Sequence, residues 1–191
     1  MRFKVMTFVL VLAGLASVQA SAQSFNLGLE AGANFSNFIG GDTSSYLSGA
    51  SNNRLGFVGG GFLSLNFGTS FSIRPEVLYE QKGTAIQGTT TTAELDYVEI
   101  PVLLKLSLGT PVLNPAILLG PSFNWNTASS VSTGGSLSNV NSSDVGIMGG
   151  LEIDIDKFLI SGRYELGLDN IQQNVNVQNG TITLLAGYSF M

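Results

Sequence analysis

The side chains that enzymes use most often for acid–base and nucleophilic chemistry are scarce in this sequence. Its 191 residues include no His and no Cys. Mechanisms that need an imidazole base, an imidazole ligand, a thiol nucleophile or a disulfide framework are therefore excluded. Carboxylates and amines would have to carry any chemistry. We expect a non-enzymatic protein with no catalytic residue and no cofactor.

The acidic run Glu152-x-Asp154-x-Asp156 is the pattern closest to a metal site. It lacks the Gly and the closing Glu of an EF-hand loop. It also lies at the end of a predicted strand beside a turn, where acidic side chains are commonly solvated. We therefore predict no metal site. The glycine-rich stretch 56–61 is not a phosphate loop, because no Gly-Lys-Ser/Thr follows it.

Most of the other charged residues alternate with apolar ones. In the stretch 71–83 the apolar side chains share one parity and the charged ones share the other, and the stretch 94–108 repeats this pattern. A period of two puts successive side chains on opposite faces of a strand. Each of these two strands therefore has one apolar face and one face that carries both signs of charge.

We interpret the charged faces as the lining of a closed interior, in which the charges pair with one another. The predicted members of this structural lumen charge network are Arg74, Glu76, Glu80, Lys82, Glu99, Lys105, Glu152, Arg163 and Glu165. Glu30, Asp154 and Asp169 share the same parity. The interior pairs that we expect are Arg74/Glu76, Glu99/Lys105 and Arg163/Glu165. A path for protons or ions along these pairs is the alternative to a structural network.

Eight alternating stretches supply the elements that position these charges. They are residues 24–38, 54–67, 71–83, 94–108, 112–126, 144–155, 157–169 and 180–190. Short connections alternate strictly with long ones, and the long ones are 39–53, 84–93, 127–143 and 170–179. A membrane-spanning strand needs about 9–11 residues, and outer-membrane barrels have short turns at one end and long loops at the other. The sequence predicts an all-β fold, an eight-stranded antiparallel up-and-down transmembrane β-barrel.

Three further features refine this prediction. Eight strands enclose a space just wide enough for side chains, so we expect a packed lumen and no open aqueous pore. Aromatic residues of the apolar parity gather near both ends of the strands, as in the two girdles of a membrane barrel. Pro75, Pro101 and Pro121 lie inside predicted strands, so each implies a bulge or a local gap in the hydrogen-bond ladder.

The first residues resemble an export signal. Arg2 and Lys4 are followed by an apolar core, 5–18, which is too short to span a membrane, and by the small-x-small sequence Ala20-Ser21-Ala22. We predict a signal peptide at 1–22, an outer-membrane β-barrel domain at 23–191 and a location in the outer membrane of a Gram-negative envelope. The net charge of −5 argues against nucleic acid as a partner.

Several segments resemble the PorT-like outer-membrane β-barrel proteins of Bacteroidetes-type bacteria. They are 72–83 (SIRPEVLYEQKG), 95–105 (LDYVEIPVLLK), 28–37 (GLEAGANFSN), 119–123 (LGPSF), 163–171 (RYELGLDNI) and 185–190 (LAGYSF). The resemblance implies an eight-stranded barrel with both termini in the periplasm and no catalytic residues to carry over. The founding member is linked to protease export, a role that a family resemblance does not transfer. Here Phe190 is followed by Met191, which departs from the terminal aromatic residue that is common in such barrels.

The function that we expect is that of an envelope scaffold, an adhesion protein or an assembly- or secretion-associated factor that works through its long loops. A narrow, porin-like channel for ions or solutes is the first alternative, and a soluble lipocalin-like carrier with its apolar face turned inward is the second. The expected partners are outer-membrane lipid and lipopolysaccharide, the barrel-insertion machinery, and an envelope protein or glycan bound by the loops.

Overall fold

The structure is a computed structural model that describes residues 24–41, 51–86, 92–110, 112–131, 142–170 and 177–190. The predicted signal peptide and the central parts of the four long loops lie outside these ranges. Within the described residues, no helix is long and apolar enough to cross a membrane.

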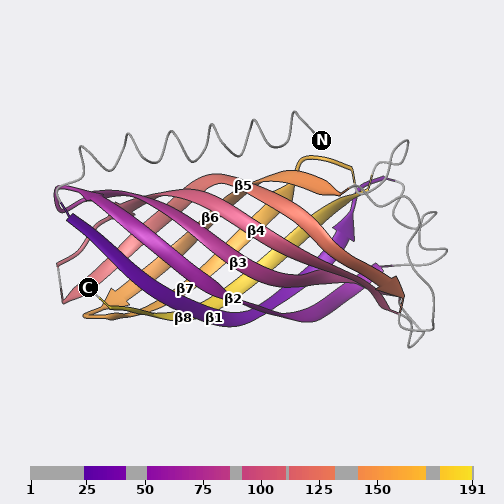
Figure 1. The fold of residues 1–191 in the computed structure, drawn as a ribbon, viewed down its shortest axis with the longest axis horizontal. Helices are drawn as coiled ribbons and strands as arrows, with labels where there is room; N and C mark the ends of the chain where they lie inside the picture. Colours follow the sequence, from indigo (N-terminus) through magenta and orange to yellow (C-terminus); the bar gives the residue numbers. More distant parts are fainter. Residues whose placement is uncertain are drawn as a thin grey trace.

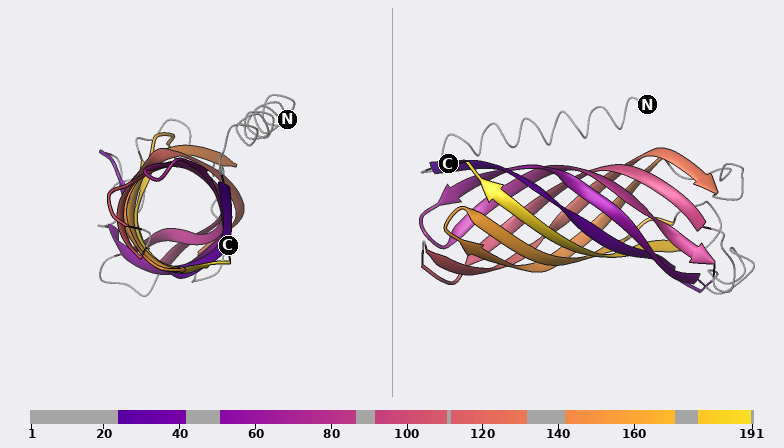
Figure 2. Two further views of the ribbon diagram at one scale, coloured as in Figure 1. Left: turned by 90° about the vertical axis from the view of Figure 1, so that its left-hand side faces the viewer. Right: turned by 90° about the horizontal axis from the view of Figure 1, so that it is seen from below.

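Eight strands form one closed antiparallel barrel in sequence order, and β8 pairs with β1 to complete the ring (Figures 1 and 2). This confirms the predicted fold class. The strands tilt relative to the barrel axis, and β1 begins at the same end of the barrel at which β8 ends (Figure 1). The strands are β1 (Ser24–Ile39), β2 (Ser51–Phe67), β3 (Phe71–Ile86), β4 (Thr92–Ser107), β5 (Leu113–Val131), β6 (Ser143–Ile155), β7 (Phe158–Gly167) and β8 (Gln178–Ser189).

The alternation of side chains determines which face of each strand lies inside the barrel. Along β4, buried and partly exposed residues alternate almost without interruption. The buried parity carries the charges, and the exposed parity carries large apolar side chains such as Leu119, Leu151 and Ile160. The apolar face therefore points outward, as lipid contact requires. This overturns the lipocalin-like alternative, in which the apolar face would surround a ligand.

The strands next to the long loops extend further than the sequence pattern indicates. β2 begins at Ser51, β3 reaches Ile86 and β5 reaches Val131, so parts of the expected loops 39–53, 84–93 and 127–143 are strand. Apolar side chains are needed at alternate positions only where a strand contacts lipid. Beyond the lipid, the backbone hydrogen-bond ladder continues through Ser, Thr and Asn. About 9–11 residues suffice to span the membrane, so strands of 16 or more residues project beyond it at this end.

The short connections have the turn geometry that their sequences indicate. Residues 68–70 join β2 to β3, and Gly68 adopts a positive φ of 74°. Asp156 and Lys157 join β6 to β7, and Asp156 has a φ of 54°. Asp is among the few residues that tolerate this left-handed conformation. These turns, together with residues 108–110 and 112, form the short-turn end of the barrel.

Pro75, Pro101 and Pro121 interrupt the ladders without shifting them. Opposite Pro75 the β2–β3 pairing has a gap, and the register is the same on both sides of it. The β3–β4 ladder has a similar gap at Pro101, and the β4–β5 ladder has one at Pro121. Proline has no N–H to donate, so local gaps are the expected consequence. The glycine run 59–61 pairs regularly with β1.

Aromatic side chains gather on the outer face at both ends of the strands. At the short-turn end, Tyr188 contacts Phe158 and Phe190 with ring centroids 5.2 and 5.7 Å apart. At the loop end, Phe57 and Tyr79 are exposed. This placement matches the two interfacial girdles of a membrane barrel.

Candidate functional site

The lumen holds two groups of ion-paired side chains, stacked along the barrel. The arginine cluster lies toward the short turns, and the lysine cluster lies toward the long loops. The arginine cluster consists of Glu30, Arg74, Glu76, Lys105, Glu152, Asp154 and Arg163. The lysine cluster consists of Glu80, Lys82, Glu99 and Glu165. The structure thus brings all nine predicted network residues into the lumen, together with Glu30 and Asp154.

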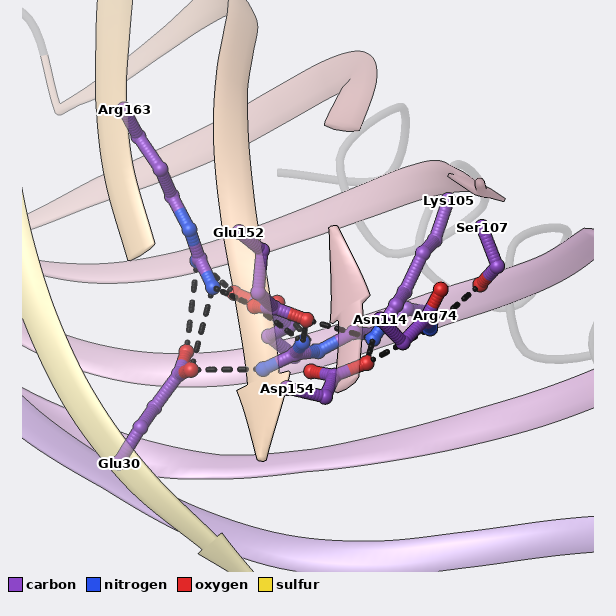
Figure 3. A network of polar contacts seen from close by, with 9 residues as sticks. Glu30, Arg74, Lys105, Ser107, Asn114, Glu152, Asp154 and Arg163 are labelled. Carbon is purple, nitrogen blue, oxygen red and sulfur yellow. Dashed lines mark hydrogen bonds and ion pairs between the residues drawn. The ribbon is translucent and has the colours of Figure 1, made fainter. Parts of the chain in front are cut away.

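Arg74 is the centre of the arginine cluster and is fully buried. Its Nη1 donates to both carboxylate oxygens of Glu152 at 2.7 Å, and its Nη2 donates to Glu30 Oε2 at 2.7 Å (Figure 3). Its Nε lies 2.9 Å from Glu76 Oε1. The guanidinium carbon also lies 3.8 Å from the centroid of the Phe62 ring, which is cation–π geometry.

Arg163 approaches the same carboxylates from β7. Its Nη1 donates to Glu76 Oε2 at 2.6 Å, and its Nη2 donates to Glu30 Oε2 at 3.1 Å. Glu30 and Glu76 are therefore each shared between two arginines. Since charge-assisted pairs with several hydrogen bonds are the strong ones, the cluster ties β1, β3, β6 and β7 together across the lumen.

Lys105 extends the arginine cluster toward the short-turn end. Its Nζ donates to Glu152 Oε1 at 2.7 Å and to Asp154 Oδ2 at 2.5 Å (Figure 3). Asn114 donates from Nδ2 to the same Asp154 oxygen and to Ser107 Oγ, each at 3.0 Å. The charged network thus ends in a layer of neutral polar side chains.

The lysine cluster gathers three carboxylates around one ammonium group. Lys82 Nζ lies 3.0 Å from Glu80 and 3.1 Å from Glu99, and it also donates to Glu165. Neutral groups complete the coordination of the carboxylates: Asn34 donates to Glu80 at 2.8 Å, and Asn124 donates to Glu165 at 2.7 Å.

This cluster is also the place in the described residues where a metal ion could be considered. One carboxylate oxygen from each of Glu80, Glu99 and Glu165 lies within 4.8 Å of the others. Lys82 contacts all three carboxylates, so its ammonium already supplies the positive charge that an ion would bring. The three residues of the acidic run 152–156 do not come together around one point. Glu152 and Asp154 bind Lys105, whereas Asp156 is exposed in its turn.

Of the three interior pairs predicted from the sequence, one is present in the structure. Arg74 contacts Glu76, but Glu99 pairs with Lys82 rather than with Lys105, and Glu165 also pairs with Lys82 rather than with Arg163. Residues two apart on a strand point into the lumen side by side. The tips of long side chains meet partners from strands across the barrel, which a linear pattern does not reveal. Asp169 lies outside both clusters, exposed beyond β7, where it accepts a bond from the Val145 N–H.

The sequence pattern also missed the neutral members of the lumen. Asn34, Ser122, Asn124 and Thr183 are buried and bind the carboxylates of the lysine cluster. Their parity is that of the charges, so parity could have indicated that they face inward. No feature of the sequence identifies which carboxylate each one binds.

Apolar side chains fill the lumen beyond the lysine cluster, toward the long loops. Tyr97 is buried there, with its ring centroid 5.6 Å from Lys82 Nζ. Other buried apolar residues near this end are Phe38, Ala93, Leu95 and Val177. From the arginine cluster to this apolar layer, ion-paired and apolar side chains of the described residues occupy the lumen.

Comparison with known proteins agrees with this geometry. Residues 19–173 match the profile of a family described as outer membrane protein beta-barrel domain. The chain belongs to this family. It is an outer-membrane β-barrel protein, as predicted. The match does not reach the finer PorT-like level, which stays a prediction. No curated protein matches the chain.

Solved structures resemble this outer-membrane barrel in fold. Neisserial surface protein A (NspA) aligns with a TM-score of 0.57 and 16% identity, over 88% of this chain and all of that one. OprG from Pseudomonas aeruginosa aligns with a TM-score of 0.49 and 13% identity, over 89% of this chain and 98% of that one. Ail from Yersinia pestis aligns with a TM-score of 0.46 and 18% identity, over 87% of this chain and all of that one. At these identities the likeness to NspA concerns the fold alone.

Proposed function

We propose that this barrel is a non-enzymatic envelope protein, a scaffold, adhesion or assembly factor whose working surface is formed by its long loops. The observation that supports the proposal is the packed middle of the lumen. Buried ion pairs and apolar side chains occupy it, which favours a role outside the lumen over the passage of solutes. The surface beyond the membrane has the room that a large partner needs.

The composition of the loops indicates how they would recognise that partner. The segments 39–53, 84–93, 127–143 and 170–179 contain one charged residue between them, Asp42, and they are rich in Ser, Thr, Asn, Gln and Gly. Hydroxyl and amide groups recognise partners by hydrogen bonds rather than by net charge. We therefore expect binding to a glycan or to a polar envelope protein, with little dependence on salt.

A narrow, porin-like channel is the second candidate. The alternation of charges inside the barrel favours it, because a polar interior is also what channels have. The geometry favours the first candidate, because each cation in the lumen is held by two or more carboxylates. A conducting path would require these buried pairs to separate, at a cost of several kcal/mol per uncompensated ion.

The chain would reach the outer membrane through the signal peptide at 1–22 and the barrel-insertion machinery. It would contact outer-membrane lipid and lipopolysaccharide, with no nucleic acid among its partners. A secretion-associated role would require a partner protein at the loops.

Site-specific photo-crosslinking in intact cells tests the proposal. A photo-reactive residue at Ser136, in the segment 127–143, should capture a distinct envelope partner. The matched control is the same residue at Thr69, in the short turn at the opposite end, which should not capture that partner. Replacing residues 132–141 with a short Gly/Ser linker should leave the barrel folded and abolish capture by probes in the other loops. Unchanged capture after this replacement would contradict the proposal.

A further inference from the structure

The lumen has a cavity at its short-turn end. This cavity has a volume of about 540 Å³ and is lined by residues of all three short turns, including Thr69, Thr110 and Asp156. Arg74 and Lys105 of the arginine cluster form its floor. It is therefore a cup at the short-turn end, which is the periplasmic end in outer-membrane barrels, and no described residue of the long loops lines it.

Small neutral polar side chains make up much of the wall of the cup. In the arginine cluster the lumen-facing positions carry charges, whereas between that cluster and the turns the same parity carries Ser and Asn. Residues of this kind from five neighbouring strands line the cavity: Asn26, Ser64, Asn66, Ser72, Ser107 and Asn114. Each offers a hydroxyl or an amide, so this part of the wall presents uncharged donors and acceptors. The lining also includes Asp154, which is paired with Lys105, and the turn residues Asp156 and Lys157, whose charges are opposite.

The charges at the floor are already paired. Arg74 binds Glu30 and Glu152, and Lys105 binds Glu152 and Asp154. An anionic ligand would have to compete with carboxylates that are already held at 2.5–2.7 Å. The wall also supplies some apolar surface, because Phe62 and Leu159 line the cavity.

Some of the polar groups of the wall are held only weakly. Asn66 donates from Nδ2 to Ser24 Oγ at 3.2 Å and to Asn26 Oδ1 at 3.3 Å. These distances lie at or beyond the long end of the usual range. A ligand hydroxyl could therefore replace these bonds at little cost.

We propose that this cup binds a neutral saccharide of about one or two rings. Sugar hydroxyls both donate and accept, as the Ser and Asn wall requires, and the C–H faces of a sugar ring suit Phe62 and Leu159. The volume lies within the range of about 300–1,000 Å³ that small-molecule sites occupy. Because the cup faces the periplasm, its ligand is either a free sugar or the end of a cell-wall glycan. This site is separate from the loops and does not depend on the function proposed for them.

The test is an NMR titration of the full barrel, ¹⁵N-labelled and inserted in lipid nanodiscs. The two probes are the β-1,4-linked disaccharide of N-acetylglucosamine, which represents a glycan end, and maltose, which has no acetamido group. Two variants change the cup: Asn66→Ala removes a donor, and Ser64→Phe fills space. Asn37→Ala is the matched control, because it removes an amide at the opposite end of the barrel. Heat-modifiable gel mobility establishes that each variant is folded.

The expected result is a set of saturable shifts in amides around the cup. Asn66→Ala should weaken the affinity by about tenfold, as expected for the loss of one good hydrogen bond. Ser64→Phe should abolish binding, and Asn37→Ala should leave it unchanged. Binding of the acetylated disaccharide alone would support the proposal with a glycan end as the source, and equal binding of maltose would support it with free sugars. The absence of saturable shifts with both probes would overturn it. Shifts that Asn66→Ala and Ser64→Phe both leave intact would also overturn it.

Discussion

Arg74 and Glu152 form a bidentate ion pair across the inside of the barrel, although they are separated by 78 positions in the sequence. Arg74 Nη1 lies 2.7 Å from each carboxylate oxygen of Glu152, and neither side chain is exposed to solvent. The pair joins β3 to β6, which are not neighbours in the sheet. Backbone hydrogen bonds connect each strand only to its neighbours in the barrel. The Arg74–Glu152 pair adds a contact across the lumen and so stabilises the closed cross-section.

Arg74→Met should destabilise the barrel strongly. The variant leaves Glu30, Glu76 and Glu152 buried with too little positive charge, and breaking a buried pair in this way typically costs about 3–5 kcal/mol. Urea unfolding in lipid vesicles, followed by heat-modifiable gel mobility, measures the change. Lys157→Met in the exposed β6–β7 turn is the control and should unfold at the wild-type urea concentration. An Arg74→Met barrel as stable as the wild type would show that the arginine cluster contributes little to stability.

Lys82 and Glu165 should show strong energetic coupling. Lys82→Met leaves three carboxylates without their shared ammonium, and Glu165→Gln relieves part of the resulting repulsion. The double variant should therefore be more stable than the sum of the single effects predicts, by about 0.5–3 kcal/mol. This coupling free energy is obtained from the unfolding free energies of the wild type, the two single variants and the double variant.

A matched pair near the outer rim provides the reference for this cycle. Arg54 and Glu94 lie 3.4 Å apart and are partly exposed. Exposed pairs contribute about 0.2–1 kcal/mol, so the coupling between Arg54 and Glu94 should be the smaller of the two. Equal coupling in the two cycles would argue against a buried lysine cluster.

Leu119→Arg should be costly, whereas Leu108→Arg should be nearly neutral. Leu119 points outward and is 54% exposed, midway along β5 between the short-turn end and Trp125, and an Arg near the bilayer midplane costs about 2–4 kcal/mol. Leu108 is 68% exposed but lies in a short turn beyond β4, where the cost falls to about 0–1 kcal/mol. Vesicle unfolding titrations compare the two. A similar cost at both positions would mean that the β5 face does not contact lipid.

The fold could be predicted from the sequence because its determining signals are local. A period of two in residues 94–108 defines two faces without knowledge of any other strand. The alternation of short and long connections then defines an up-and-down order. The extent of the strands at the loop end was missed, because residues such as Thr84 and Ser129 pair beyond the lipid, where alternation is no longer needed.

The candidate site could be predicted only as a set of residues. Parity placed Glu99, Lys105 and Glu165 inside the barrel, but it could not reveal their partners. Those depend on strand tilt and register, which decide that Lys82 meets Glu165 and that Lys105 meets Glu152. Asp169 shows the limit of parity, since it has the inward parity but lies beyond the end of β7.

Ion pairs and apolar side chains occupy the middle of the lumen, between the cup at the short-turn end and the long loops. Planar-bilayer recording of the purified, folded barrel tests whether they close it to ions. We expect no steady current at any voltage, in the wild type and after replacement of residues 132–141 by a linker. A stable conductance that scales with the amount of folded protein, and that changes when Lys105 or Arg74 is neutralised, would contradict this expectation and establish the channel instead.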